Sequence, residues 1–198
     1  KTNIHIHLPP NFSAFESVAQ AVELAARQGV KVVGASNYYD YDVYGDFASL
    51  ARQHGVFPLF GLEIIAMDDE LRRTSVKLND PGNPGKLYIC GKGITRFAPF
   101  SAEAERLIAV IRRNDTQRMA EMVRRMERAF AAHGVSTGLD LPAIVDRIVA
   151  RHGCRREAVY PQERHLAQAF QEVLSEKVPA AQRLDTLAAI LGARPKAD

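Results

Sequence analysis

The chain has 198 residues, of which 46% are hydrophobic and 25% are charged, and its formal net charge is +3. These values are typical of a globular protein with one domain, or with one domain and a small appendage. No apolar run is long enough to span a bilayer, no signal-peptide pattern begins the chain, and two cysteines do not make a disulfide framework. We therefore expect a cytoplasmic protein that has no membrane partner.

Residues 1–100 alternate between strand and helix patterns. In the first strand, over residues 2–8, apolar residues alternate with histidines, so that His5 and His7 share one face. The elements expected after it are a helix with Ser13 and Glu16 as its capping box and Gly29 at its end, a strand over 30–35, a helix over 46–54 and a strand over 56–65. This order predicts a parallel sheet with functional groups at the C-terminal ends of its strands, and Glu63 lies on one of them.

A hairpin and a run of helices complete the pattern. Residues 73–78 and 87–91 are strand-like and flank a turn rich in proline and glycine. Beyond them the apolar spacing predicts helices that begin near Ser101 and near Asn114 or Asp115, and helices over 141–151, 162–174 and 179–191. We therefore expect an α/β part over 1–100 and an all-helical subdomain over 101–198. The side chains expected inside it are Leu107, Ile111, Met119, Met126, Ile144, Ile148, Leu166 and Phe170.

The helical part is rich in arginine. Six arginines lie within the 17 residues from Arg112 to Arg128, and Glu121 and Glu127 are interleaved with them. Acidic and basic residues three or four positions apart form ion pairs on a helix surface. Because stacking aromatic residues are nearly absent there, a solvated helix face is favoured over a nucleic-acid interface.

The paired histidines are the first candidate site. Two neutral imidazoles two residues apart at a strand end are a ready pair of ligands for a divalent metal ion. The alternative is that His5 and His7 are ordinary side chains on a solvated face. Glu63 is a candidate third ligand only in company with them, since a single glutamate on a strand is usually solvated or ion-paired.

Four segments together resemble the PHP (polymerase and histidinol phosphatase) domain family. They are Asn3-Ile4-His5-Ile6-His7, Val33-Gly34-Ala35-Ser36-Asn37-Tyr38, Gly61-Leu62-Glu63 and Leu87-Tyr88-Ile89-Cys90-Gly91-Lys92-Gly93. Residues Glu163 to Ala167 are similar to a run in the helical insertion of small members. The resemblance implies a distorted seven-stranded (β/α) barrel, with a site that binds up to three divalent ions and hydrolyses phosphoesters.

The chain also departs from the family pattern. Tyr38 and Tyr88 replace two histidines, Asn37 replaces an aspartate, and Phe12 stands where another aspartate is expected. The resemblance therefore implies a single divalent ion in this chain, with His5, His7 and Glu63 as its metal ligands. The ion expected for these ligands is Zn, Mn or Fe. Tyr38, Tyr88 and Asn37 are candidate substrate-binding residues, the tyrosines as hydrogen-bond donors to a phosphate. No catalytic acid or base is assigned.

Later motifs of the family have no counterpart before the end of the sequence. The expected fold is therefore an α/β, partial or distorted PHP-type barrel with a helical subdomain. The remaining strands would come from further sequence or another chain, or the fold is a half-barrel with a helical lid. The expected function is that of a divergent metal-dependent phosphoesterase, a phosphoric ester hydrolase whose activity in this chain is weak or lost. Its substrate would be a phosphorylated small molecule or nucleotide; the alternative is a non-catalytic module that binds a phosphorylated ligand or partner.

Overall fold

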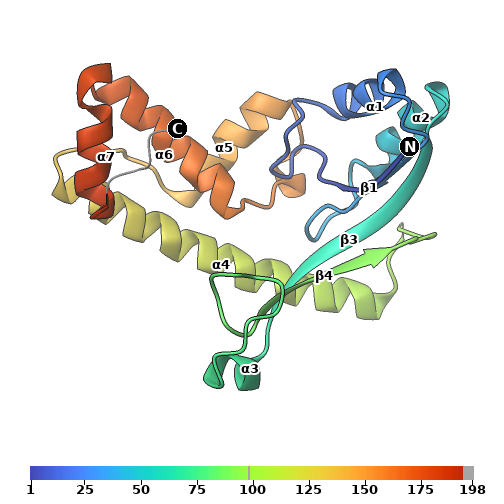
Figure 1. The fold of residues 1–198 in the computed structure, drawn as a ribbon, viewed down its shortest axis with the longest axis horizontal. Coiled ribbons are helices and arrows are strands. Elements are labelled where there is room, and N and C mark those ends of the chain that lie inside the picture. The colour runs from blue at the N-terminus through green and yellow to red at the C-terminus, as the bar shows by residue number, and fades with distance from the viewer. Residues whose placement is uncertain (98, 194–198) are drawn as a thin grey trace. The chain divides into compact units, whose positions relative to one another are not determined.

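The structure is a computed structural model that describes residues 1–97 and 99–193 (Figure 1). Its contacts divide the chain into two compact units, which separate between Ala109 and Val110. Residue 98 and residues 194–198, the end of the expected helical subdomain, lie outside the described part. Within the described part, no helix is both long and apolar enough to cross a membrane.

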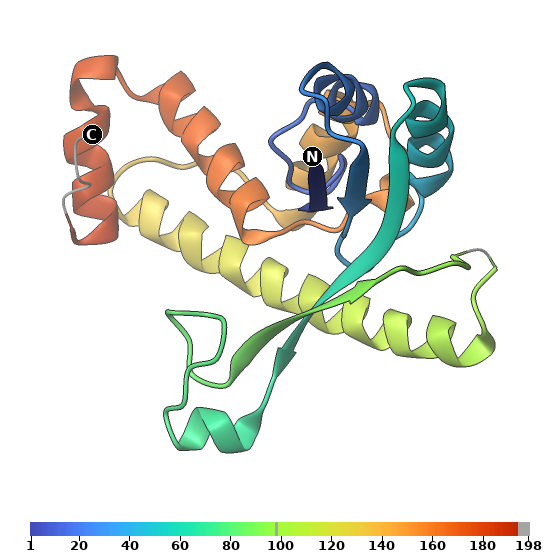
Figure 2. The same ribbon diagram turned by 45° about the vertical axis from the view of Figure 1, so that its right-hand side comes forward.

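The first unit is built on a four-stranded sheet in the order β1-β2-β3-β4. Its strands are β1 (Thr2–Ile6), β2 (Val32–Ala35), β3 (Phe57–Met67) and β4 (Lys86–Lys92). The first three run parallel, and β4 runs antiparallel to β3. In Figure 2, β3 curves away from β1 and β2 and continues as a two-stranded ribbon with β4. The sheet is thus a curled part of a barrel.

Two helices provide the crossovers between the parallel strands. They are α1 (Val18–Arg27) and α2 (Tyr44–Gln53), which pack against each other. Their apolar side chains join those of β1 and β2 in one buried cluster that includes Leu8, Val22, Val33, Tyr44 and Phe47. Burial of this cluster stabilises the parallel arrangement that the βαβαβ order predicts.

The start of α1 differs from the sequence-based expectation. Ser17, not Ser13, is the N-cap, and its side chain accepts a hydrogen bond from the backbone N–H of Gln20. The Ser13 hydroxyl instead donates to the carbonyl of His7 at 2.6 Å. The predicted capping box of Ser13 and Glu16 is therefore wrong, because Ser13 fastens the turn that follows β1. The predicted end is confirmed, since Gly29 adopts a φ of +70°.

The sequence correctly predicts a hairpin, but the predicted first strand is wrong. Residues 73–78 form no strand; the short helix α3 (Asp69–Arg73) and a loop stand there. The partner of β4 is β3, which pairs Glu63 with Cys90 and Ile65 with Tyr88. Because β3 extends to Met67, it already offers β4 a complete ladder.

The second unit is helical, as predicted. Its elements, of which α4 begins within the first unit, are α4 (Ala102–Ala132), α5 (Leu141–His152), the short 3-10 helices η1 (Arg156–Ala158) and η2 (Ala180–Gln182), α6 (Glu163–Lys177) and α7 (Arg183–Leu191). No strand occurs in the described residues from 101 onward. The break expected at Asn114 or Asp115 is wrong, because α4 continues through both, and Asp115 pairs with Arg118 at 2.7 Å.

Most of the side chains expected inside the helical unit are buried or partly buried. Met119, Ile144, Ile148, Leu166 and Phe170 belong to one core cluster, and Met126 packs against it. Leu107 is an exception, since 48% of its surface is exposed. The apolar spacing at the start of α4 thus predicts a helix correctly but does not show which of its faces is covered.

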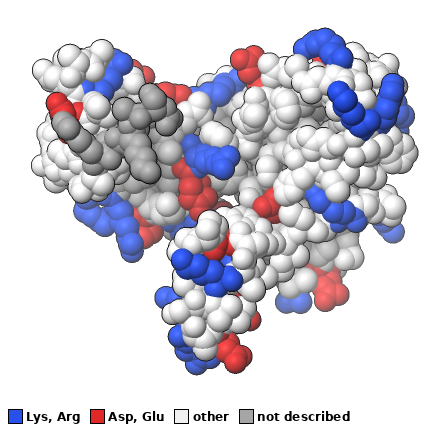
Figure 3. All heavy atoms as spheres, in the orientation of Figure 1, with Lys and Arg blue, Asp and Glu red and all other residues white. Residues whose placement is uncertain are grey.

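The arginine-rich stretch is a solvated helix face only in part, since Arg118 also pairs with Glu163 of α6 at 2.6 Å. Glu121 pairs with Arg124 at 2.8 Å and with Arg125 at 3.0 Å, and all three side chains are substantially exposed. On the face shown in Figure 3, basic and acidic side chains are interspersed. That this helix face does not bind nucleic acid stays a prediction.

Candidate metal centre

The sheet brings the two histidines and Glu63 together. His5 lies in β1, His7 follows its end, and Glu63 lies in β3 with only 6% of its side chain exposed. His5 Nε2 is 2.8 Å and His7 Nε2 is 3.3 Å from the same oxygen, Oε2 of Glu63. The convergence predicted from period-two alternation and strand order is confirmed. That these residues bind a metal stays a prediction.

Close packing holds β1 in this position. The β1–β2 register shifts between Asn3 and Ile6. At the shift the Ile4 carbonyl approaches Gly34, where a Cβ would lie 2.5 Å from the Ile4 oxygen. The same oxygen accepts a hydrogen bond at 2.8 Å from Lys92 Nζ, which also donates to the Ser36 hydroxyl. Strand β1, and His5 with it, is therefore tied to both β2 and β4.

Asn37 fixes the segment that follows His7. Its side-chain oxygen accepts from the backbone N–H of Leu8 at 2.8 Å, and its amide nitrogen donates to the Leu8 carbonyl at 2.9 Å. Next to it, the N–H of Tyr38 donates to Asn11 Oδ1 at 2.7 Å. Asn37 thus has a positioning role; the substrate contact expected of it stays a prediction.

Glu63 is held in its charged form. Burial alone would raise the pKa of its carboxyl, but hydrogen bonds from His7, Tyr38 and His5 outweigh burial and lower this pKa to about 2. The Tyr38 hydroxyl donates to Oε1 at 2.8 Å. Burial and this bond raise the Tyr38 pKa far above its usual range, so the phenol keeps its proton. At neutral pH the carboxylate is therefore ready to bind a cation.

The Tyr38 ring also supports His7. The two rings stack at 4.9 Å between centroids and 9° between planes. Tyr38 thus contacts one imidazole with its ring and the carboxylate with its hydroxyl. One feature differs from most metal sites: His7 Nδ1 is buried and has no hydrogen-bond partner among the described residues, whereas metal-binding histidines usually donate from their second nitrogen.

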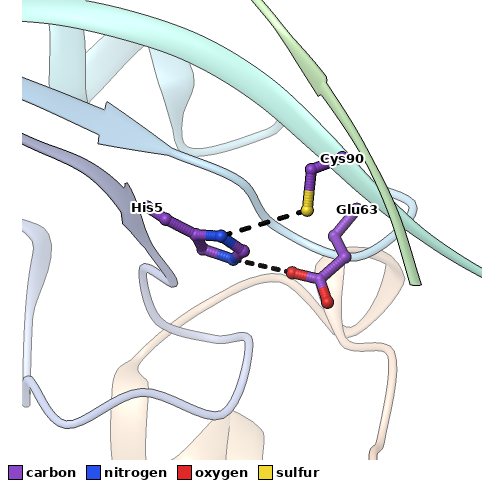
Figure 4. A group of neighbouring side chains, drawn as sticks. All are labelled: His5, Glu63 and Cys90. Atoms are coloured by element: carbon purple, nitrogen blue, oxygen red, sulfur yellow. Dashed lines mark hydrogen bonds and ion pairs between the residues drawn. The ribbon is translucent and has the colours of Figure 1, made fainter. Parts of the chain in front are cut away.

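Cys90 is the member of the group that sequence reasoning missed. It lies opposite Glu63 in the β3–β4 ladder, and opposite residues of an antiparallel pair point to the same face. Its Sγ is 3.9 Å from His5 Nδ1 (Figure 4). Burial and the neighbouring Glu63 carboxylate raise the pKa of this thiol. Only the register of the hairpin shows that Cys90 faces the histidines.

Tyr88 belongs to a neighbouring polar group. Its hydroxyl donates to Asp80 Oδ2 at 3.4 Å, and Lys86 Nζ lies 4.9 Å from its ring centroid. Lys86 also pairs with Asp80 at 3.1 Å. Together with backbone N–H donors, this pair holds the pKa of the Asp80 carboxyl well below its usual range. A substrate contact by Tyr88 stays a prediction.

The donors fit a divalent ion in kind and in spacing. One donor atom each from His5, Glu63 and Cys90 lies within 4.8 Å of the other two. Four-coordinate zinc, with bonds of about 2.0–2.3 Å, keeps its ligand atoms about 3.3–3.7 Å apart. The 3.3 Å between His7 Nε2 and Glu63 Oε2 falls in this range, the 2.8 Å between His5 Nε2 and the same oxygen is shorter, and Cys90 Sγ lies 3.9 Å from the other ring nitrogen of His5, Nδ1. Small side-chain shifts would therefore complete a metal site.

Known structures support the fold. No family model and no curated protein matches the sequence. An amidohydrolase from Chromobacterium violaceum, solved with bound sulfate and no metal, is similar with a TM-score of 0.57 and 16% identity over 86% of this chain and 49% of that one. A Bifidobacterium adolescentis protein assigned as a metal-dependent phosphoesterase is similar with a TM-score of 0.50 and 19% identity over 97% of this chain and 63% of that one.

These similarities establish an α/β architecture with a partial, curled barrel and helices. At such identities they describe the fold alone. The chain spans about half the length of the first protein and less than two thirds of the second.

Proposed function

We propose that this chain carries the metal centre of a divergent, PHP-type metal-dependent phosphoesterase. The observation that carries the proposal is the approach of two imidazole Nε2 atoms to one buried oxygen of Glu63, at 2.8 Å and 3.3 Å. Two histidines and one carboxylate hold an ion while leaving a coordination position for water or substrate. The family resemblance of the motifs around His5, His7 and Glu63 gives the reaction class.

The chain's own residues prepare the site for phosphate chemistry. A bound ion would supply Lewis acidity and lower the pKa of a water molecule. Glu63 supplies a negative charge that the His7, Tyr38 and His5 hydrogen bonds keep ionised. Tyr38 keeps a hydroxyl proton, here donated to Glu63, that it would donate to a phosphate oxygen if the bond to Glu63 were released. The substrate class we infer is a phosphorylated small molecule or nucleotide.

We expect turnover by this chain alone to be weak or absent. Two-metal hydrolysis depends on a second ion to stabilise the attacking and leaving oxygens. Tyr38 stands where the family pattern has a histidine, and a protonated phenol is a poor ligand for a divalent ion. One ion with few supporting charges can activate water but stabilises the transition state less.

One observation favours a non-catalytic alternative. The Tyr38 hydroxyl is bonded to Glu63 and its ring is stacked on His7, so this side chain occupies space beside both donors. A site with a tyrosine at this position would still bind a cation and would offer phenol hydroxyls as hydrogen-bond donors. These groups would suffice to bind a phosphorylated ligand or partner. Both functions require a bound metal ion, and they differ in whether the substrate is hydrolysed.

The test combines metal binding with hydrolysis. Calorimetry should show binding of Zn or Mn that is lost in His7→Ala and retained in His133→Ala, since His133 lies in the second unit, where its ring is hydrogen-bonded to the Ala129 carbonyl of α4. A panel of phosphomonoesters and short oligonucleotides should show turnover well below about 1 s⁻¹. Turnover of about 1 s⁻¹ or more that His7→Ala abolishes would make the chain a competent enzyme. Phosphate binding without turnover would establish the alternative, and absence of metal binding would refute both.

A further inference from the structure

We propose that Cys90 is a ligand of the ion at this centre, so that the site selects zinc or ferrous iron over manganese and magnesium. The inference deepens the proposed function, because it concerns the same ion, and adds a thiolate to the imidazole and carboxylate donors. Cys90 lies within one of the segments that resemble the PHP family, but that resemblance gives it no role as a ligand.

The β3–β4 hairpin fixes Cys90 in place. The ladder runs without interruption from Gly61 opposite Lys92 to Met67 opposite Lys86, with Glu63 opposite Cys90 in between. A one-residue slip would turn the thiol to the other face of the ribbon. In Figure 4 the Cys90 sulfur and the Glu63 carboxylate both point toward the His5 ring, from two different strands. Three strands thus contribute one donor each.

The distances suit a shared ion better than a hydrogen bond. The 3.9 Å between Cys90 Sγ and His5 Nδ1 is long for a hydrogen bond to a thiol, and His5 would bind an ion shared with Cys90 and Glu63 through only one of its two ring nitrogens, of which Nε2 lies 2.8 Å from Glu63. The sulfur, the carboxylate and the imidazole all lie within 4.8 Å of one another. His7, at 3.3 Å from the same Glu63 oxygen, is placed to complete the set.

The chemistry of sulfur determines which ions such a set prefers. Thiolate is a soft ligand that favours zinc and iron, while magnesium and manganese favour oxygen ligands. On coordination Cys90 would lose its proton to solvent, since a thiol bound to a metal is deprotonated. Zinc sites with cysteine and histidine ligands and one open position are found in hydrolytic and redox enzymes alike. The open position keeps this inference compatible with a phosphoesterase.

Cobalt substitution tests the ligand directly. Co(II) bound to a thiolate gives an intense sulfur-to-metal charge-transfer band in the near ultraviolet, and Co(II) bound only to nitrogen and oxygen does not. We expect the band in the wild-type chain and in Cys154→Ser, because Cys154 packs against the core of the helical unit. In Cys90→Ser the band should disappear while the weaker visible bands of bound Co(II) remain. The affinity for zinc should fall at least about tenfold.

A protection assay gives a second readout that does not depend on the Cys90 variant being folded. In Cys154→Ser, Cys90 is the only thiol, and zinc should slow its alkylation whereas magnesium should not. Wild-type protein that binds Co(II) without the charge-transfer band would overturn the inference and leave the proposed function standing. Persistence of the band in Cys90→Ser would also overturn it. Failure to bind any of these ions would refute the metal centre itself.

Discussion

Tyr38 shows how one side chain changes what a site can do. Its hydroxyl lies 2.8 Å from Glu63 Oε1, and its ring stacks on His7. In the PHP family that the sequence motifs resemble, this position is a histidine, which offers a nitrogen to a metal, whereas the protonated phenol offers only a hydrogen bond. The sequence alone shows the replacement. Only the structure shows that the hydroxyl supports the Glu63 carboxylate.

The first prediction concerns this hydroxyl. Tyr38→Phe keeps the stacking on His7 and removes the hydrogen bond to Glu63, so zinc affinity should fall about tenfold or more, as when other partners of ligating carboxylates are removed. Calorimetry with Tyr41→Phe as the matched control should detect the difference, because the Tyr41 ring contacts Tyr44 and Phe97 instead. Higher affinity in Tyr38→Phe would mean that the hydroxyl competes with the ion for the carboxylate.

The elements of the sheet explain which parts of the site could be predicted from the sequence. That His5 and His7 lie on the same face of β1 follows from the two-residue period of a strand. That they lie close to Glu63 follows from the order of strands and helices. Cys90 could not be predicted in the same way, because its place depends on the register between β3 and β4. That register is set by pairs of residues that lie 19 to 31 positions apart in the sequence, from Met67 with Lys86 to Gly61 with Lys92.

The helix boundary predicted at Asn114 or Asp115 was wrong for a similar reason. Asn114 and Asp115 favour helix starts in isolation, yet α4 continues through them. Asp115 forms an ion pair with Arg118 inside the helix, and Arg118 reaches Glu163 of α6 at 2.6 Å. Side-chain partners and tertiary packing thus outweigh a local preference for capping, which is worth about 1 kcal/mol.

The second prediction concerns the fit between β1 and β2. In Gly34→Ala the new Cβ would meet the Ile4 oxygen at 2.5 Å and the Ile4 carbonyl carbon at 2.7 Å, both backbone atoms. Strand β1 must move away, so we expect a loss of about 1–3 kcal/mol in the free energy of unfolding, together with weaker zinc binding through His5.

Gly45 is the matched control for this substitution. It lies in α2, and nothing stands within 4 Å of a Cβ built there. Gly45→Ala should therefore be neutral or stabilise the protein by up to about 1 kcal/mol. Urea denaturation and zinc titration measure both variants. Equal stability of Gly34→Ala and wild type would show that the approach of Ile4 to Gly34 can relax without cost.

At the scale of the whole molecule, the two compact units have separate cores. One cluster is formed by α1, α2 and the sheet, and the other by side chains from Met119 to Val178. All four candidate metal donors, His5, His7, Glu63 and Cys90, lie in the first unit. Ion binding is therefore expected to stabilise one unit selectively, since a ligand stabilises the structure that it binds.

The third prediction is a regional pattern of hydrogen exchange. With zinc at about 100 times its dissociation constant, binding adds about 2.7 kcal/mol to the stability of the unit that holds it. Backbone amides of β1, β3 and β4 that exchange through unfolding of this unit should then slow by about a hundredfold, while those of α5 and α6 keep their rates. His7→Ala should remove the zinc effect and supplies the control. Equal slowing in α5 and α6 would contradict this prediction. It would mean that the two units unfold together although their cores are separate.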